Sequence, residues 1–197
     1  MKKLVFATNN PHKIEEIKQI LGDTFLILSL RDLNFEEDIP ETGTTLRENA
    51  SQKSHFIFER FGMDCFADDT GLEVDALGGD PGVYSARYAG EKATYDENVE
   101  KLLSQLKGEK IRSARFKTVI SLLLDGKEYF FEGKVEGEIT RERRGTDGFG
   151  YDPVFLPDGF TETFAEMSGG LKNKISHRGR AVAKLVDFLK QQHNGEN

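Results

Sequence analysis

The fold class is decided by residues 113–139, which read SARFKTVISLLLDGKEYFFEGKVEGEI. Two long runs, 113–124 and 127–139, are separated by the dipeptide Asp125-Gly126. Asp-Gly between two such runs is a strong signal for the tight turn of a β-hairpin. The stretch therefore predicts two long neighbouring strands.

Before this hairpin, apolar strands alternate with helices. Strands are predicted at 2–7, 25–30 and 63–67. Helices are predicted from Pro11 to Leu21 with Gly22 as C-terminal cap, from Thr44 or Thr45 to Phe61 with Gly62 after it, and from Thr94, with Glu97 in a capping box, to about Leu106. The polar stretch 31–42 is expected to be irregular, and the glycine-rich stretches 78–90 and 145–150 are expected to be loops.

After the hairpin, a last helix is predicted to begin at Ser176, with a polar tail from Gln191 that frays. This order of elements predicts an α/β protein with a mixed sheet. A length of 197 residues fits one domain, with two lobes around a shared core.

Composition narrows the class of protein. Mean hydropathy is −0.52, and no apolar run approaches the roughly 18 residues of a membrane span, so we expect a soluble protein without a membrane partner. A net charge of −7 argues against a general nucleic-acid binder, although positive charge is locally dense at 141–144 and 172–180. The only cysteine, Cys65, lies in an apolar run and fits a core position in a reducing cytoplasm.

Two adjacent carboxylates, Asp68 and Asp69, follow the apolar run 63–67 and precede Thr70-Gly71. We interpret them as lying in a turn at the end of a strand, where both carboxylates converge on one spot. Two such charges repel each other unless a positive group lies beside them. The pair therefore indicates a divalent metal or a metal-bound polyphosphate, and the alternative is an ordinary solvated turn.

Three further polar features suggest ligand binding. The segment Thr8-Asn9-Asn10-Pro11-His12-Lys13 brings small polar groups to a helix N-terminus, which attracts anions. Lys53 falls on the inner stripe of its helix, so its ammonium either extends to the surface or pairs with a buried negative group. Arg178, after Ser176 and His177, faces inward at the positive end of a helix, a costly position unless it donates to a ligand.

A glycine-flanked loop, Gly148-Phe149-Gly150-Tyr151-Asp152-Pro153, carries two aromatic rings and a carboxylate. Glycine allows the backbone to approach a ligand closely. An aromatic face can stack on a nucleobase, and a carboxylate can accept from a purine N–H. The alternative is a turn filled by its own aromatic side chains.

Taken in order and spacing, these segments resemble the inosine triphosphate pyrophosphatase family, which hydrolyses triphosphates of non-standard purines. The matching segments are Thr8-Asn9-Asn10 with Lys13, Glu41-Thr42-Gly43, Ala67 to Leu72, Phe149 to Pro153, and Ser176-His177-Arg178. The resemblance covers residues 2 to about 190. Where many bacterial members carry glycine, this chain has Asn9.

The resemblance implies hydrolysis of ITP, dITP or XTP to the monophosphate and pyrophosphate, with Mg²⁺ as cofactor. It implies metal binding by Glu41 and Asp69, with Asp69 also the base. It implies substrate contacts at Thr8, Asn9, Asn10, Pro11, His12, Lys13, Lys53, Thr70, Phe149, Gly150, Tyr151, Asp152, Lys172, His177 and Arg178. It further implies an elongated sheet flanked by helices, two lobes with a central cleft, and a homodimer.

The residues alone leave alternatives open. A diphosphatase for other modified nucleotides would use the same groups, and a nucleotide sensor would bind the triphosphate without releasing pyrophosphate. An RNA-binding module using Tyr84, Tyr88 and the 141–144 cluster conflicts with the acidic balance. Whether Asp68 or Asp69 is the base, and what rejects the guanine 2-amino group, is left open.

Overall fold

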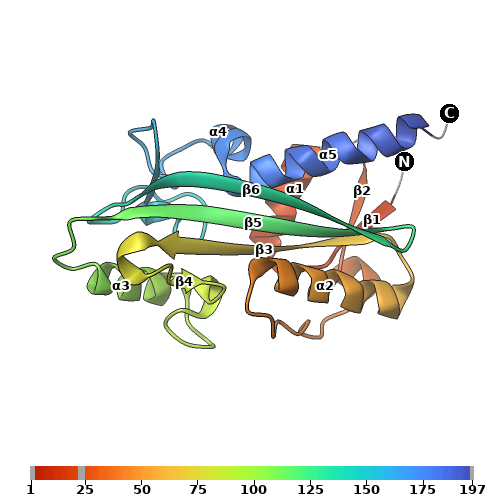
Figure 1. The fold of residues 1–197 in the computed structure, drawn as a ribbon, viewed down its shortest axis with the longest axis horizontal. Helices are drawn as coiled ribbons and strands as arrows, with labels where there is room; N and C mark the ends of the chain where they lie inside the picture. Colours follow the sequence, from red (N-terminus) through yellow and green to blue (C-terminus); the bar gives the residue numbers. More distant parts are fainter. Residues whose placement is uncertain (1–2, 22–24, 196–197) are drawn as a thin grey trace. The chain divides into compact units, whose positions relative to one another are not determined.

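A computed structural model of the chain describes residues 3–21 and 25–195 (Figure 1). Within these ranges, the strands form one mixed sheet in the order β2-β1-β3-β5-β6-β7, and β4 pairs with β3. The strands are β1 (Lys3–Phe6), β2 (Leu26–Ser29), β3 (Cys65–Val74), β4 (Pro81–Gly82), β5 (Ser113–Leu124), β6 (Lys127–Ile139) and β7 (Phe155–Pro157). The α-helices are α1 (Pro11–Leu21), α2 (Leu46–Phe61), α3 (Tyr95–Gln105), α4 (Gly169–Ile175) and α5 (His177–Gly195).

The predicted α/β class and mixed sheet are confirmed. Strand β1 runs parallel to β2 and β3, whereas β4 pairs antiparallel with β3, and β7 antiparallel with β6. The hairpin of β5 and β6 has the predicted bounds, and its turn places Asp125 at φ 50° and Gly126 at φ 74°. Left-handed backbone at both positions is what a type I′ hairpin turn needs.

Local signals also located the helices. Thr45, rather than Thr44, caps α2 through a capping box with Glu48, and Thr94 caps α3 in the same way with Glu97. Gly62 ends α2 at φ 63°. The predicted cap at Gly22 lies outside the described residues.

Two expectations about the elements are wrong, and two short elements were not expected. Strand β3 does not end at Ala67 but continues to Val74, so Asp68 and Asp69 lie inside a strand and not in a turn. Helix α5 continues through Gln191 to Gly195, where a frayed tail was predicted. Helix α4 and strand β7 were not predicted, because each is too short to show a period in the sequence.

The chain divides into two compact units, each described by itself. The first comprises residues 1–69, 118–133 and 178–197, and the second comprises residues 70–117 and 134–177. Strands β3, β5 and β6 each contribute residues to both units. The predicted cleft between two lobes stays a prediction.

In the first unit, alternation along the strands builds two apolar layers. Leu4 and Phe6 pack with α1 and α5, while Val5 and Ala7 pack with α2. Figure 1 shows α2 on the opposite side of the sheet from α1 and α5. Cys65 lies in the α2 layer with no exposed surface, as its apolar surroundings predicted.

The second unit has its own core, in which aromatic side chains from several elements meet. The Phe116 ring contacts Phe155 and Phe164, and α3 adds Leu102, with Leu106 just after the helix end. No helix among residues 3–21 and 25–195 combines the length and apolar character that a membrane crossing requires.

Candidate functional site

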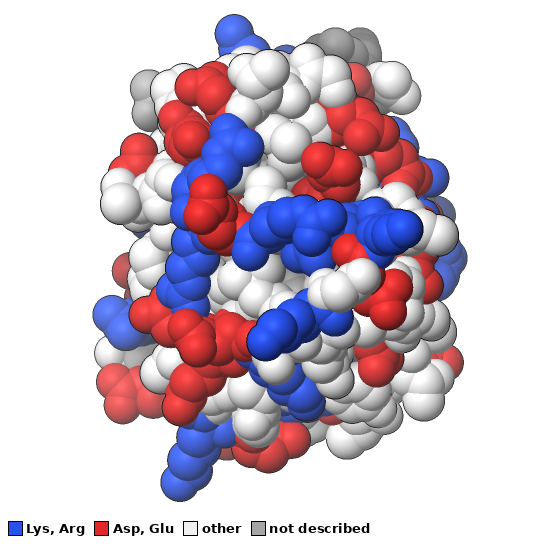
Figure 2. All heavy atoms as spheres, turned by 90° about the vertical axis from the view of Figure 1, so that its left-hand side faces the viewer, with Lys and Arg blue, Asp and Glu red and all other residues white. Residues whose placement is uncertain are grey.

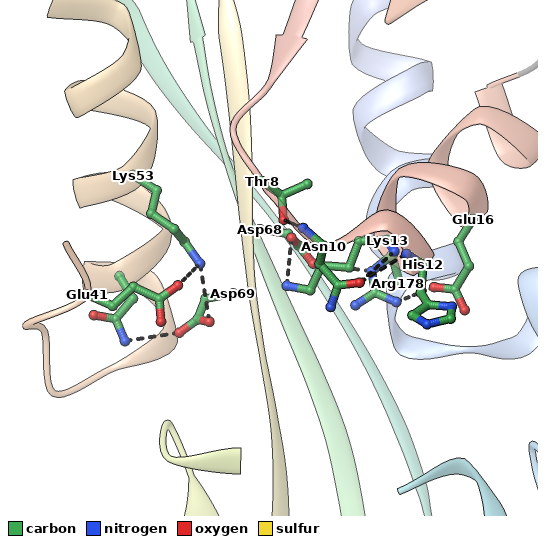
Figure 3. Close-up of polar contacts among 11 residues, drawn as sticks. Thr8, Asn10, His12, Lys13, Glu16, Glu41, Lys53, Asp68, Asp69 and Arg178 are labelled. Carbon is green, nitrogen blue, oxygen red and sulfur yellow. Dashed lines mark hydrogen bonds and ion pairs between the residues drawn. The ribbon is translucent and has the colours of Figure 1, made fainter. Parts of the chain in front are cut away.

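Strand β3 sends its two adjacent carboxylates to opposite faces of the sheet. Side chains alternate along a strand, so Asp69 shares a face with Cys65 and Ala67, and Asp68 shares the other face with Phe66. Figure 3 shows Asp69 on one side of β3 and Asp68 on the other. The expected convergence of the two carboxylates is therefore wrong, because it assumed a turn where the strand continues.

On the α2 face, Asp69 meets an ammonium group and a second carboxylate. The Lys53 Nζ lies 2.5 Å from Glu41 Oε1 and 3.5 Å from Asp69 Oδ1 (Figure 3). Asn49 donates to Asp69 Oδ2 at 3.1 Å. Of the two alternatives for Lys53, the structure bears out the negative partner, since the side chain is only 8% exposed and pairs with Glu41.

Burial and neighbouring charges determine the protonation states of Asp69 and Lys53. Burial raises the pKa of Asp69, and Lys53 and Lys13 only partly oppose that effect. Burial alone would lower the pKa of Lys53, but Asp69 and Glu41 outweigh it and raise that pKa. Lys53 is therefore a permanent cation beside a carboxylate that is more basic than an ordinary aspartate.

On the opposite face, Asp68 is held by two cations from different helices. Lys13 of α1 donates to Oδ1 at 2.9 Å, and Arg178 of α5 donates to Oδ2 at 3.2 Å. Arg178 also pairs with Glu16 of α1. Although burial opposes the charge, Lys13 and Arg178 hold the pKa of Asp68 well below its usual range.

This geometry changes the interpretation of Arg178. Its inward position is confirmed, with 3% of the side chain exposed. The reasoning that it needs a ligand acceptor is wrong, because Asp68 and Glu16 of the protein accept from it. Lys13 likewise has Asp68 as its anion, while burial lowers the pKa of Lys13.

The segment before α1 mainly caps that helix. The Asn10 carboxamide accepts from the backbone of His12 at 3.0 Å, and Thr8 Oγ1 accepts from the backbone of Asn10 at 3.2 Å. Asn9 donates instead to the backbone of Glu37. Pro11 and His12 are exposed at the start of the helix, and among this segment only Lys13 joins the charged cluster described above.

In the second unit, the aromatic loop folds around a buried ion pair. Lys172 donates to Asp152 Oδ2 at 2.7 Å, and the Phe149 N–H donates to the same oxygen at 2.8 Å. The Lys172 ammonium lies 5.0 Å from the centre of the Phe149 ring. A Cβ on Gly148 would lie 2.1 Å from Asp152 Oδ2, so this close approach requires glycine.

Four other residues predicted to contact the substrate lie in the second unit, and their substrate contacts stay predictions. Tyr151 is buried, and its hydroxyl donates to the Ser85 backbone at 2.8 Å. The buried His177 ring stacks on Phe116 at 4.5 Å. Thr70 is half-buried in β3, and Gly150 is half-buried at φ 61°.

The 141–144 cluster is not a free basic patch. Arg143 pairs with Asp96 and Glu100, and Arg144 pairs with Glu166. Figure 2 shows acidic and basic side chains interleaved over one face of the molecule. An RNA surface built on this cluster gains no support from such pairing.

Sequence reasoning missed two residues at the site, Glu16, which pairs with Arg178, and Asn49. Asn49 is fully buried and contacts both Asp69 and the backbone of Gly43. Its helical spacing, four residues before Lys53 and next to Ala50, already placed it on the inner stripe of α2. A polar side chain on that stripe was the signal that could have found it.

The fold is that of an α/β protein, and the charged groups around Asp68 and Asp69 include buried carboxylate and ammonium groups suited to an anionic ligand. A model of the Ham1 family matches residues 4–188. The dITP/XTP pyrophosphatase of Flavobacterium johnsoniae is 57% identical over 187 residues, covering 95% of this chain and 97% of that protein. That of Porphyromonas gingivalis is 56% identical over 190 residues, covering 96% and 98%.

Solved structures agree with the sequence comparison. The Ham1 protein of Staphylococcus aureus superposes with a TM-score of 0.87 at 41% identity, covering 97% of this chain and 100% of that one. A HAM1 protein from Coxiella burnetii gives 0.88 at 38% identity with the same coverage. The chain belongs to the Ham1 family, and the resemblance drawn from its motifs is confirmed.

Proposed function

We propose that this protein hydrolyses dITP, XTP and ITP to the nucleoside monophosphate and pyrophosphate. The observation that carries the proposal is the contact of buried Lys53 and Asp69 with half-buried Glu41, which joins a basic carboxylate to a fixed cation. The names of relatives with more than half of their residues identical support the substrate class.

In the proposed reaction, Asp69 orients a water molecule and takes its proton. The water oxygen bonds to the α-phosphorus, the bond from that phosphorus to the bridging oxygen breaks, and pyrophosphate leaves with the electron pair. Lys53 and Lys13 neutralise phosphate charge, which is the main electrostatic requirement of phosphoryl transfer. The raised pKa of Asp69 favours its role as base over that of Asp68, whose pKa is lowered by two cations.

The residues present fit a Mg²⁺ ion. Glu41 and Asp69 meet at the same Lys53 ammonium, and carboxylate oxygens are the ligands that Mg²⁺ prefers. The polar cluster of the first unit holds three cations, Lys13, Lys53 and Arg178, against four carboxylates, Glu16, Glu41, Asp68 and Asp69. A triphosphate adds more negative charge, and a Mg²⁺ held by Glu41 and Asp69 would supply the neutralisation that the side chains lack.

For the purine, we propose the loop around Phe149. Its ring offers a stacking surface, and the Lys172–Asp152 pair offers a buried donor and acceptor. A donor opposite C6 can donate a hydrogen bond to the oxygen of hypoxanthine or xanthine and is mismatched with the amine of adenine. Polar groups left unpaired by the wrong base are what give such a site its discrimination.

The test is product analysis with purified protein. Pyrophosphate and orthophosphate release are measured from dITP, XTP, ITP, GTP and ATP, with Mg²⁺ and with excess chelator. We expect Mg²⁺-dependent pyrophosphate release that is fastest for the first three nucleotides. Orthophosphate as first product, or unchanged rates in chelator, would contradict the proposal, and binding without any release would identify a nucleotide sensor.

Two further expectations follow from the resemblance. We propose a homodimer in the cytoplasm, and light scattering coupled to size exclusion tests the dimer. A mass equal to one chain of 22.2 kDa at micromolar concentration would contradict it.

A further inference from the structure

Helices α2 and α3 begin with the same five-residue pattern. The first is Thr45-Leu46-Arg47-Glu48-Asn49, and the second is Thr94-Tyr95-Asp96-Glu97-Asn98. In both, the threonine and glutamate form a capping box, and the asparagine after the glutamate is buried. The two asparagines are therefore matched in helix position, capping and burial.

Both asparagines tie a preceding loop to their helix. The Gly43 N–H donates to Asn49 Oδ1 at 2.8 Å, and the Ala89 N–H donates to Asn98 Oδ1 at 2.7 Å. The remaining amide group differs in its partner. Asn98 donates to the backbone of Ala86 at 3.0 Å, whereas Asn49 donates to the side chain of Asp69 at 3.1 Å.

The loop that Asn49 ties down carries Glu41. A Cβ on Gly43 would lie 2.6 Å from Glu48 Cβ and 2.8 Å from Asn49 Oδ1, so the close contact requires glycine. The neighbouring Thr42 N–H donates to Gln52 Oε1 at 2.9 Å, one turn further along α2. A single carboxamide therefore links the loop of Glu41 to the carboxylate of Asp69.

We propose that Asn49 is a positioning residue that fixes Asp69 relative to the Glu41 loop, and that Asn98 is its purely structural counterpart. The inference rests on the function proposed above for Asp69. Asn49 restricts rotation of the carboxylate by donating to Oδ2, and it anchors the loop by accepting from the backbone N–H of Gly43. Asn98 stabilises its own helix and loop in the same way without touching an ionisable side chain.

The experiment compares Asn49→Leu and Asn49→Asp with Asn98→Leu and Asn98→Asp. Leucine removes both hydrogen bonds, while aspartate keeps the acceptor for the loop N–H, removes the amide donor and puts a second carboxylate beside Asp69. For each variant we would measure kcat and KM for dITP at saturating Mg²⁺, the thermal midpoint, and hydrogen exchange at the Gly43 and Ala89 amides.

We expect both leucine variants to lower the thermal midpoint and to speed exchange at their own loop amide. Only the Asn49 variants should lose kcat, by about tenfold or more, as for a lost hydrogen bond to a charged group. Asn49→Asp should keep the Gly43 amide protected and still lose kcat, which would show that the anchored loop alone does not sustain turnover without the amide contact to Asp69. If Asn49→Leu does not fold, Asn49→Asp against Asn98→Asp decides.

Two results would overturn the inference in distinguishable ways. If both Asn49 variants keep kcat within about twofold while Asp69→Asn is inactive, Asn49 is structural only and the proposed function stands. If Asp69→Asn itself keeps wild-type kcat, the function proposed for Asp69 fails, and the positioning role falls with it.

Discussion

The opposite orientation of Asp68 and Asp69 predicts that their amide substitutions have opposite consequences. Asp68→Asn removes a carboxylate that has no exposed surface, so half-buried Lys13 loses that anion and buried Arg178 keeps Glu16. Removing one partner of a buried ion pair costs about 3–5 kcal/mol. For a chain of this size that corresponds to a fall of roughly 6–20 °C in the thermal midpoint.

Asp69→Asn should not lower the thermal midpoint. Burial raises the pKa of Asp69, so the folded protein disfavours its charged form, and a neutral side chain of the same shape relieves that cost. We expect an unchanged or higher thermal midpoint together with loss of turnover, since an amide takes no proton from water.

The assay is thermal unfolding of both variants and the wild type at pH 7, followed by pyrophosphate release at a temperature where all three are folded.

The stability that Asp68 contributes should also depend on pH, with a defined sign. The pKa of Asp68 is lowered on folding, so its contribution is complete above its unfolded value of about 4 and is lost as pH falls below that value. The gap between wild type and Asp68→Asn should therefore close in acid.

A specific result would refute this reasoning. If Asp69→Asn lowers the thermal midpoint as much as Asp68→Asn does, the two carboxylates are not separated into a structural and a reacting group. If Asp68→Asn is fully stable but inactive, the roles are reversed.

Three further predictions follow from the same contacts. Lys53→Met leaves Glu41 and Asp69 facing each other without a cation and should lower kcat/KM by roughly 10- to 150-fold; unchanged kcat/KM with only a shifted thermal midpoint would make Lys53 structural. Arg178→Ala should lower activity on all triphosphates alike, because Asp68 is among its acceptors; a selective loss on dITP and XTP would instead show that it contacts the purine. Burial raises the pKa of the Cys65 thiol to about 12, so Cys65 should resist iodoacetamide at pH 8 until the protein unfolds. Labelling of the native protein at the rate of a free thiol would contradict this. The stability contribution of that thiol should decline as pH rises from about 9 toward 12.

The sequence predicted those elements whose signals are local. The hairpin at Asp125-Gly126 and the caps at Thr45, Gly62 and Thr94 depend on backbone conformations that a few neighbouring residues determine. The extent of β3 was not predicted, because Asp68-Asp69-Thr70-Gly71 has the composition of a turn. Pairing with β1, which is distant in sequence, starts that strand, and contact with helices on both faces stabilises its carboxylates.

At the site too, features that depend on neighbouring residues could be predicted, and contacts between distant residues could not. The inward position of Lys53 could be predicted from helical spacing, whereas its partners Glu41 and Asp69 come from other segments of the chain. The acceptors of Arg178 could not be predicted, because Glu16 and Asp68 lie 162 and 110 residues away in the chain. An inward cation indicates a buried acceptor, but the sequence alone does not say whether that acceptor belongs to a ligand or to the protein.

In the proposed reaction, water activated by Asp69 attacks the α-phosphorus of the nucleotide. Hydrolysis of dITP in ¹⁸O-enriched water, followed by mass spectrometry of both products, identifies the phosphorus that the water attacks. We expect the ¹⁸O atom in the nucleoside monophosphate and unlabelled pyrophosphate. Label in the pyrophosphate, or in released orthophosphate, would place the attack at the β- or γ-phosphorus and would contradict the proposed reaction.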